Sequence, residues 1–522
     1  MRSLYSLRPK LRRPLVNCAR RWSSQNQLET QLTARNGLRW TQPLGLFIDN
    51  EFVRSQGRKA LETVDPFTEQ GICSVSAATK TDIDHAVSSA RRALRSPAWK
   101  SLSGTDRGIL MMKLASLVDQ HAETLATIES LDNGKPLSAS RSYDVPQFSE
   151  VLRYYAGFAD KIFGSVIDVG PGKMAYTLKQ PVGVCGQIIP WNYPLAMAAW
   201  KLGPALCCGN TIVLKLAENT PLSMLYLATL IREAGFPPGV INIVNGHGYE
   251  AGAALASHAD VDKIAFTGST STGKEIMRMA AATMKAITLE TGGKSPLIVF
   301  EDCDLEQAVR WAHEGIMANQ GQVCTATSRI LVQEKVYDEF VGRFKAYTSQ
   351  VSVLGDPFNE NTFQGPQVSA QQRDRVLTYI TAAEAAETLV HQPVSAALPS
   401  TGFFVPPTIF TDVSTSSVVF QEEIFGPCAA IAKFTTEMEA LSIANGTRYG
   451  LAGAVFTKDL ARAHRMARDI EAGMVWMNSS NDSDVRVPFG GVKESGLGRE
   501  LGEYGLRGYY NVKAVHINLT NE

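Results

Sequence analysis

The chain has 522 residues, of which 44% are hydrophobic, so it is long enough to bury a large core and to form two or three domains. Its 51 basic and 51 acidic side chains balance, and the lack of any run of 18 apolar residues argues against an integral membrane protein. The 8 cysteines include no CxxC pair and no histidine at ligand spacing, which argues against a zinc site and a secreted disulfide framework.

Residues 1–24 are predicted to be a mitochondrial presequence, which would place the protein in the mitochondrial matrix. Seven basic residues with scattered serines and leucines precede the first acidic residue, Glu29, and the apolar core of a secretory signal is missing. A disordered basic tail on a cytosolic protein is the alternative. Removing those seven of the 51 basic residues would leave 44 against 51 acidic ones, a mildly acidic chain with no electrostatic reason to bind nucleic acid.

A hairpin and a helical region are predicted next along the chain. The pattern of residues 46–55 predicts a hairpin around Asp49 and Asn50, and a loop is expected to follow as far as Pro66. Apolar residues at helical spacing then predict a long helical region over residues 80–161.

Strands and helices alternate after this region, which predicts βαβ units on a parallel sheet. Gly209 is expected to end one helix, and Thr220 to cap the next with Pro221 in its first turn. A second α/β series starts near Ser295 without a linker, so a compact interface with a ligand-binding crevice is expected between the two series. The predicted strands are 182–191, 211–216, 240–246, 261–269, 296–300, 328–334, 450–457 and 473–478, and the predicted helices are 194–209, 220–235 and 304–320.

A turn with two glycines, "FTGSTSTGKE", follows the strand at 261–269. Gly268 and Gly273 would let backbone N–H groups approach an anion at the positive end of the next helix. The turn nearly matches a P-loop, but Glu275 stands where a P-loop needs a hydroxyl for magnesium. Without its neighbours, the turn is equally compatible with an ordinary capped helix.

Lys215 and Glu218, at the end of the strand at 211–216, give the turn a functional context. A carboxylate there can accept hydrogen bonds from ribose hydroxyls and repel an additional ribose phosphate. The pair therefore favours NAD over NADP, although a surface ion pair at a strand end is the alternative.

The sequence contains, in this order, the motifs "PWNYPL", "KLAENTP", "FTGSTSTG", "LETGGKSP", "NQGQVC", "EEIFGP" and "PFGGVKESGLGRELGEYGL". Taken together, these motifs resemble the aldehyde dehydrogenase superfamily, in particular its NAD-dependent, non-acylating, tetrameric mitochondrial-type branch. The resemblance covers Gly45 to Val515, and it implies NAD as cofactor, an aldehyde as substrate and a homotetramer. It also implies an α/β fold, with a Rossmann-like NAD-binding domain (31–162 and 182–292), a second α/β catalytic domain (293–507) and a small β oligomerisation arm (163–181 and 508–522).

The resemblance implies a role for each matching position. Cys324 matches the catalytic nucleophile, Glu290 the general base, and Asn192 the side chain that forms the oxyanion hole with the backbone N–H of Cys324. Lys201 and Glu500 resemble residues implicated in proton relay, and no metal is expected. The matching cofactor contacts are Ile189, Trp191, Lys215, Glu218, Gly268, Ser269 and Gly273, with Glu423 and Phe425 at the nicotinamide ribose.

The chemistry of aldehyde oxidation explains why these residue types are needed. A thiolate that adds to the carbonyl creates the alkoxide (thiohemiacetal) from which hydride can leave, and a thioester remains. Because a free thiol is only slightly ionised at neutral pH, it needs a base or a positive environment. A glutamate can also activate the water that hydrolyses the thioester, so Glu290 favours release of a free acid over transfer to coenzyme A.

Other interpretations remain open at this stage. Cys324 could be a small packing residue, the protein could be a structural or binding protein on the same fold, and a P-loop phosphotransferase is a remote third possibility. Small or polar residues at three expected tunnel positions, Ala196, Ala318 and Ser483, predict a wide, partly polar pocket that favours medium-chain or aromatic aldehydes over acetaldehyde.

Overall fold

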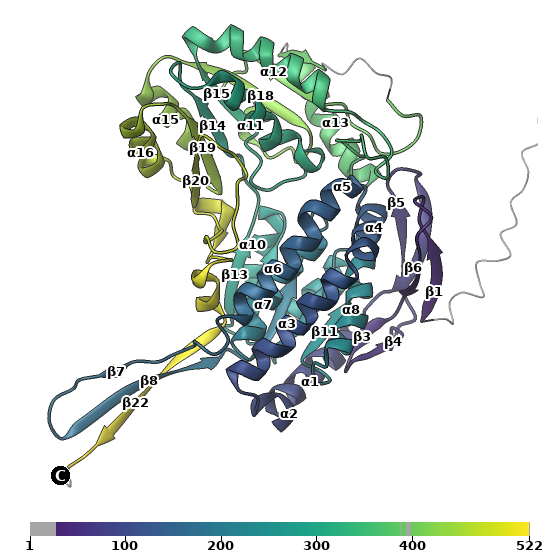
Figure 1. Cartoon of the computed structure of the whole chain (residues 1–522), viewed down its shortest axis with the longest axis vertical. Coiled ribbons are helices and arrows are strands. Elements are labelled where there is room, and N and C mark those ends of the chain that lie inside the picture. Colours follow the sequence, from purple (N-terminus) through teal and green to yellow (C-terminus); the bar gives the residue numbers. More distant parts are fainter. Residues whose placement is uncertain (1–27, 387, 393–397, 521–522) are drawn as a thin grey trace, which may run out of the picture.

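The computed structural model describes residues 28–386, 388–392 and 398–520, so the predicted presequence at 1–24 lies outside the described residues. Within the described part of the chain, no helix is both long and apolar enough to cross a membrane. The predicted α/β fold class is confirmed, because two large sheets with helices on their faces form the body of the molecule (Figure 1).

The first sheet has the strand order β21-β13-β12-β9-β10-β11-β3-β4, with parallel pairing from β13 through β11. Alternate residues of β10 face different helical layers, since Ile212 and Leu214 join one apolar cluster and Val213 joins another. The strands are β3 (Leu46–Ile48), β4 (Glu51–Val53), β9 (Val184–Ile188), β10 (Thr211–Lys215), β11 (Ile241–Val244), β12 (Lys263–Thr267), β13 (Ala286–Glu290) and β21 (Gly496–Leu497).

Helices cover both faces of this sheet and bury its apolar strands. One layer consists of α2 (Pro97–Lys100), α3 (Gly104–Gln120), α4 (Ala122–Asn133), α5 (Leu137–Ala139), α6 (Val145–Ala156), α7 (Pro194–Cys207) and α8 (Leu222–Ala234). The opposite layer consists of α1 (Lys80–Arg95), α9 (Ala253–Ser257) and α10 (Thr270–Ala281). Burial on both faces explains why β9 to β12 are rich in apolar residues and buried at every position, rather than alternating between apolar and polar.

The second sheet has the order β16-β17-β18-β15-β14-β19-β20 and is also mainly parallel. Its strands are β14 (Pro296–Val299), β15 (Arg329–Gln333), β16 (Leu389–His391), β17 (Thr408–Thr411), β18 (Cys428–Phe434), β19 (Ala452–Phe456) and β20 (Met474–Met477). Its helices are α11 (Leu305–Met317), α12 (Tyr337–Val351), α13 (Ala370–Ala385), α14 (Val418–Gln421), α15 (Glu437–Asn445) and α16 (Leu460–Asp469).

Three antiparallel strands form an arm that extends away from the body of the molecule in Figure 1. They are β7 (Val166–Ile167), β8 (Lys173–Pro181) and β22 (Tyr510–Asn518), and β22 pairs with β8 along its whole length. The arm coincides with the segments at 163–181 and 508–522 that the sequence assigns to oligomerisation, except that residues 521–522 are not among those described.

Three sequence-based expectations need correction. The expected loop up to Pro66 contains β5 (Ala60–Asp65), which pairs with β6 (Gln70–Ser76), and a separate hairpin joins β1 (Glu29–Thr33) to β2 (Arg39–Pro43). Thr220 does not cap α8: Pro221 holds the cap position, and Asp132 accepts the hydrogen bond of the Leu222 N–H at 2.8 Å. Strand β21 pairs with β13, so residues 496–497 belong to the first sheet although they fall in the predicted range 293–507.

Candidate active site

Cys324 lies in the loop that connects α11 to β15, and the shape of this loop is fixed by its own backbone. Asn319, Gln320 and Gly321 all have left-handed backbone angles, with φ of 48°, 58° and 71°. A side chain at Gly321 would collide with the backbone of Gly426, so only glycine fits there. The sequence "NQGQ" therefore forms the sharp turn that presents Cys324.

Side-chain amides hold the same loop against the segment before α13. The Nε2 of Gln320 donates to the Pro366 carbonyl at 3.2 Å, and the Nε2 of Gln367 donates to the Gln320 carbonyl at 3.1 Å. The Oε1 of Gln322 accepts from the backbone N–H of Val368 at 3.0 Å. Because the three glutamine side chains are fully buried, these hydrogen bonds are protected from water and restrict the loop to one conformation.

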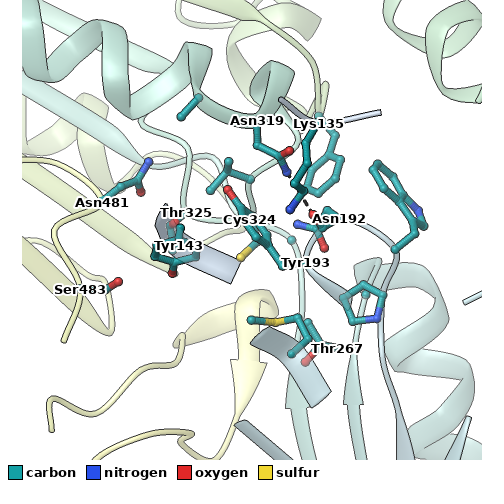
Figure 2. A pocket seen from close by; sticks show the side chains of 18 of the residues that line it. Lys135, Tyr143, Asn192, Tyr193, Thr267, Asn319, Cys324, Thr325, Asn481 and Ser483 are labelled. Carbon is teal, nitrogen blue, oxygen red and sulfur yellow. Dashed lines mark hydrogen bonds between the residues drawn. The ribbon is translucent and has the colours of Figure 1, made fainter. Parts of the chain in front are cut away.

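Asn192 precedes α7 and is tied to the loop of Cys324 in both directions. Its Nδ2 donates to the Gln322 carbonyl at 2.9 Å, and its own carbonyl accepts from the Nδ2 of Asn319 at 3.2 Å. Figure 2 shows Asn192 beside Cys324 in the same cavity. The amide group is thus positioned as a fixed donor next to the thiol, as an oxyanion hole requires.

The environment of Cys324 disfavours its thiolate. Burial is the main cause, and the negative charges of Glu423 and Glu290 add to it, so the pKa of the Cys324 thiol is raised to about 12. A thiol with this pKa stays protonated at neutral pH. The nucleophile therefore needs a base, or the positive charge of a bound cofactor, before it can react.

Glu290, the predicted base, ends β13 but does not line the cavity that contains Cys324, as far as the described residues show. Its side chain is 2% exposed and lies beside Gly490 and Gly496. Within the described part of the chain, neither carboxylate oxygen accepts a hydrogen bond of ordinary geometry. Burial, reinforced by the charge of Glu500, raises the pKa of Glu290 well above its usual range.

Lys201 and Glu500, which the resemblance links to proton relay, do meet in the structure. The Nζ of Lys201 lies 2.5 Å from the Oε1 of Glu500 and donates to the Oγ1 of Thr267 at 2.6 Å. Thr267 lines the cavity, and the charges of Lys201 and Glu500 both act on the pKa of Glu290. A chain of polar groups thus connects the cavity with the region around the predicted base.

The predicted cofactor residues gather where adjacent parallel strands end. Ile188 of β9 pairs with Lys215 of β10 and with Phe266 of β12, so the residues after these strands share one edge of the sheet. Such an edge is where doubly wound folds bind dinucleotides. Ile189, Lys215, Glu218, Gly268 and Ser269 all lie at the ends of these strands or directly after them.

Glu218 is held at this edge as an ionised acceptor. Its carboxylate lies 3.5 Å from the Nζ of Lys215 and accepts from the backbone N–H of Gly248 at 2.8 Å. Burial opposes its ionisation, but Lys215 and the Gly248 N–H outweigh burial and lower the pKa of Glu218. The side chain remains 39% exposed, so ribose hydroxyls could still reach it.

The turn with two glycines forms the predicted junction between β12 and α10. The side chain of Ser269 caps α10 by accepting from the Thr272 N–H at 3.2 Å, and Gly273 lies in the first turn of the helix. Lys274 points away from the turn, because its Nζ pairs with Glu494 at 2.8 Å. A P-loop lysine has to reach the phosphates, so this geometry argues against a P-loop.

Glu423 and Phe425 reach the cavity from the second α/β unit. The Oε1 of Glu423 accepts from the Gly293 N–H at 3.0 Å, and burial raises the pKa of this carboxylate to about 7. The ring of Phe425 meets the ring of Trp191 edge to face, with centroids 5.3 Å apart. Aromatic and carboxylate groups from both units thus face one space beside Cys324, which suits a nicotinamide riboside.

The cavity itself measures about 490 Å³ and lies between the two α/β units. It contains the predicted residues Trp191, Asn192, Gly268, Ser269, Cys324, Glu423 and Phe425. Outside its described lining are Ile189, Lys215, Glu218, Gly273 and Glu290. Of the three expected tunnel residues, Ala318 and Ser483 line the cavity. The expectation for Ala196 is wrong, because its side chain is buried in the core of the first unit.

Sequence reasoning missed several lining residues: Lys135, Tyr143, Glu314 and Trp476. Asn481, in contrast, lies in the run 479–484 that was expected to add polar surface to the tunnel. Lys135 and Tyr143 come from the predicted helical region at 80–161, which is interrupted by Gly134 and by a π-helical turn over Ser140–Asp144. The Gly-Lys-Pro sequence at 134–136 is the signal that could have located this break, since Gly and Pro end helices.

Comparisons with known proteins agree with this geometry. The family model described as "Aldehyde dehydrogenase family" matches residues 52–515. The chain is 51% identical over 483 residues to an aldehyde dehydrogenase of Emericella nidulans, covering 92% of this chain and 96% of that one. It is 51% identical over 489 residues to "Aldehyde dehydrogenase [NAD(P)+] 1" of Saccharomyces cerevisiae, with 92% and 96% covered.

A solved structure gives the same result in three dimensions. The NAD+ complex of an aldehyde dehydrogenase from Bacillus cereus superimposes with a TM-score of 0.89 at 46% identity, covering 91% of this chain and 97% of that one. The superfamily inferred from the motifs is confirmed, and a P-loop phosphotransferase is not supported. On sequence and fold together, the chain belongs to the aldehyde dehydrogenase family.

Proposed function

We propose that the protein oxidises an aldehyde to the carboxylic acid with NAD, through a thiohemiacetal and a thioester on Cys324. One observation carries the proposal: a cysteine and a fixed amide donor, Asn192, line the same cavity as Glu423 and Phe425. NAD would supply the hydride acceptor when bound. The NAD+ complex of the Bacillus cereus relative and the strand-end position of Glu218 support this choice of cofactor.

Each step of the proposed reaction can be assigned to particular residues of the chain. Cys324 loses its proton and its sulfur bonds to the carbonyl carbon, while the carbonyl oxygen becomes an alkoxide. The Asn192 amide and the Cys324 backbone N–H would donate to this oxygen, and such donors stabilise the developing charge. Hydride departure then leaves the acyl group on the sulfur as a thioester, which water must hydrolyse.

Glu290 would activate that water, and this role requires a movement of its side chain. The carboxylate lies outside the described lining of the cavity, and among the described residues the backbone N–H of Gly491 approaches it without a hydrogen bond of ordinary geometry. A rotation toward Cys324 would bring it into reach of both the thiol proton and the attacking water. The glutamate supports the non-acylating branch, in which the product is a free acid.

Location and assembly are further parts of the proposal. The basic segment 1–24 would direct the chain to the mitochondrial matrix. The arm would join chains into a homotetramer, since Val166, Leu178 and Val512 expose 75%, 41% and 61% of their surfaces there. Light scattering at micromolar protein concentration tests this assembly, and a monomer would contradict it.

The experiment that tests the proposed activity is NAD reduction measured with a panel of aldehydes. Turnover with release of the free acid is expected, and its absence with every aldehyde would favour the alternative of a structural or binding protein. Because each uncontacted methylene forgoes about 0.8 kcal/mol, the cavity should favour medium-chain or aromatic aldehydes over acetaldehyde. A maximum of kcat/KM at acetaldehyde would refute the wide-pocket interpretation.

A further inference from the structure

We propose that Glu129 and Asn133 of α4 are positioning residues that hold Asn192 in place beside Cys324. The proposal rests on the proposed function, because it concerns the oxyanion donor of the same reaction. It is carried by two hydrogen bonds from one helix, which fix the backbone directly before and shortly after Asn192. Both residues lie outside the described lining of the cavity, so they would act through Asn192.

Asn133 fixes the backbone on one side of Asn192. It is the last residue of α4, and its side chain is fully buried. Its Nδ2 donates to the carbonyl of Trp191 at 2.6 Å, whereas the hydroxyl of Thr220 reaches the same carbonyl at 3.5 Å. Because this carbonyl belongs to the planar peptide group that leads into Asn192, the hydrogen bond of Asn133 fixes the point from which Asn192 starts.

Glu129 fixes the backbone on the other side of Asn192, at the N-terminus of α7. Tyr193, at the cap position of this helix, supplies no side-chain hydrogen bond, and Pro194 in the first turn has no N–H. The Oε1 of Glu129 accepts from the Leu195 N–H at 3.2 Å, so a distant helix provides the cap that the local sequence lacks. A carboxylate also suits the positive end of a helix.

Glu129 and Asn133 are four positions apart on α4, so their side chains project from the same face of the helix. Their exposed fractions are 1% and 0%, and water therefore does not compete for the two hydrogen bonds. The carboxylate of Glu129 also interacts with the hydroxyl of Ser223 in the first turn of α8, which lies next to α4 in Figure 1. One buried helix face thus holds the chain on both sides of Asn192.

Lys135, two residues after the end of α4, contacts the same segment between these two points. Its Nζ lies 4.0 Å from the centre of the Tyr193 ring and 2.7 Å from the Oδ1 of Asp144. Figure 2 shows Lys135 and Tyr193 next to Asn192. Because Lys135 itself lines the cavity, a substitution there would change the site directly and would not isolate the positioning effect.

The position of the Asn192 backbone decides where the second hydrogen of its amide points. One Nδ2 hydrogen is used by the Gln322 carbonyl, so the other is the one available to the alkoxide. An oxyanion donor has to lie at hydrogen-bond distance from the alkoxide, and a displacement of about 1 Å can reduce the rate by on the order of 100-fold. Loss of either hydrogen bond from α4 is therefore expected to slow the chemical steps, while NAD and the aldehyde still bind.

The test is a double-mutant cycle between Asn133 and Asn192 on the full-length protein. The rate of the first turnover is measured by stopped flow as NADH formation, with saturating NAD and hexanal, or the best aldehyde of the panel if hexanal is not oxidised. Asn133→Ala should lower this rate about tenfold and leave KM for NAD within about twofold of wild type. In the Asn192→Ala background the same change should lower the rate by less than about twofold, because the donor that Asn133 positions is already missing.

Glu129→Gln and Glu129→Met provide a second comparison, which also carries the test if Asn133→Ala does not fold. Glutamine keeps an acceptor for the Leu195 N–H, so the first-turnover rate should stay within about twofold of wild type. Methionine keeps the length of the side chain but removes the acceptor, and the rate should fall about tenfold. This fall should also disappear in the Asn192→Ala background.

Thr127→Val is the matched control, since Thr127 is fully buried on the same helix and its hydroxyl accepts from the Nδ2 of Asn36 in the β1–β2 hairpin. It should lower the thermal stability without changing the first-turnover rate. If the wild-type enzyme turns over but the effect of Asn133→Ala is equal in both backgrounds, or Glu129→Gln loses as much as Glu129→Met, the inference is wrong while the proposed function stands. If no aldehyde is oxidised, the proposed function fails and the inference fails with it.

Discussion

The two residues proposed to perform the chemistry, Cys324 and Glu290, are held in opposite ways. Cys324 lies in a loop with three consecutive left-handed residues, fixed by buried glutamine side chains. Glu290 is equally well enclosed, yet its carboxylate accepts no hydrogen bond of ordinary geometry from the described residues and is approached only loosely by the Gly491 N–H. The structure thus fixes the nucleophile by several hydrogen bonds and holds the base more loosely.

This difference follows from what each group has to do. The sulfur must stay beside Asn192 while the carbonyl adds to it, and positional errors of about 1 Å can reduce rates by on the order of 100-fold. The base has to serve the thiol first and water later, so a carboxylate locked by hydrogen bonds would be unsuited to one of the two steps. A buried carboxylate held only by a loose backbone contact costs stability but would permit the rotation.

The largest expected effect comes from removing the nucleophile, Cys324, whose position the loop fixes. Cys324→Ala should lower kcat by at least about 10⁴-fold, because the reaction has no other nucleophile, while NAD binding and thermal stability stay close to wild type. Cys303→Ala is the control, since Cys303 is 9% exposed in an apolar cluster of the second unit. Substantial NAD reduction by Cys324→Ala would refute the mechanism.

Removing Glu290 should have a smaller and more selective effect. In Glu290→Gln, thioester hydrolysis is expected to slow by about 10²- to 10⁴-fold, the range for general-base catalysis, while a first burst of hydride transfer remains. Stopped-flow measurement of the burst against steady turnover separates the two steps. Equal losses in both would assign Glu290 a different role.

The pH dependence of the same pair sharpens the comparison. A base acts only when deprotonated, and burial raises the pKa of Glu290 well above its usual range. Steady-state kcat of the wild-type enzyme should therefore increase as the pH rises through this elevated pKa and then level off. Glu290→Gln should lose that increase, and an unchanged pH profile would contradict the assignment.

Asn192→Ala tests how much the fixed amide donor beside Cys324 contributes to the reaction rate. The loss of one oxyanion donor should reduce kcat by about 10²- to 10³-fold. Since Asn192 also donates to the Gln322 carbonyl, part of the loss could come from a loosened loop. NAD affinity and the rate of Cys324 alkylation distinguish the two, because a displaced loop changes both and a missing oxyanion donor changes neither.

The sequence predicted the strands, the helices and the Cys324 loop better than the parts of the site that are built from distant segments of the chain. Buried parallel strands such as Val184–Ile188 and Thr211–Lys215 are rich in apolar residues, and their helices follow at regular spacing, so local pattern and tertiary structure agree. The Cys324 loop was located by its motif. Thr220 was misplaced because Asp132, 90 positions before Leu222, accepts the capping hydrogen bond of the Leu222 N–H, and local sequence carries no sign of such a partner.

The walls of the cavity were the least predictable part of the site. Ala196 was expected in the tunnel because its position resembles the substrate tunnel of the family, but its side chain is buried in the core of the first unit. Glu314 and Asn481 come from α11 and from the loop after β20, and only the fold brings them together. Side-chain direction and long-range proximity decide which residues meet, and neither is encoded in spacing along the chain.

The smallest expected effect concerns the cofactor end, where Glu218 is held by Lys215 and by the Gly248 N–H. A carboxylate at this place accepts hydrogen bonds from the ribose hydroxyls of NAD and repels the additional ribose phosphate of NADP. The value of kcat/KM should therefore be higher with NAD than with NADP. In Glu218→Ala the preference should fall by about tenfold, because the repulsion disappears and Lys215 becomes available to a phosphate. Glu250→Gln, which removes a neighbouring carboxylate paired with Lys59, is the control and should keep the preference. Equal kcat/KM values for NAD and NADP in the wild-type enzyme would show that Glu218 does not select the cofactor.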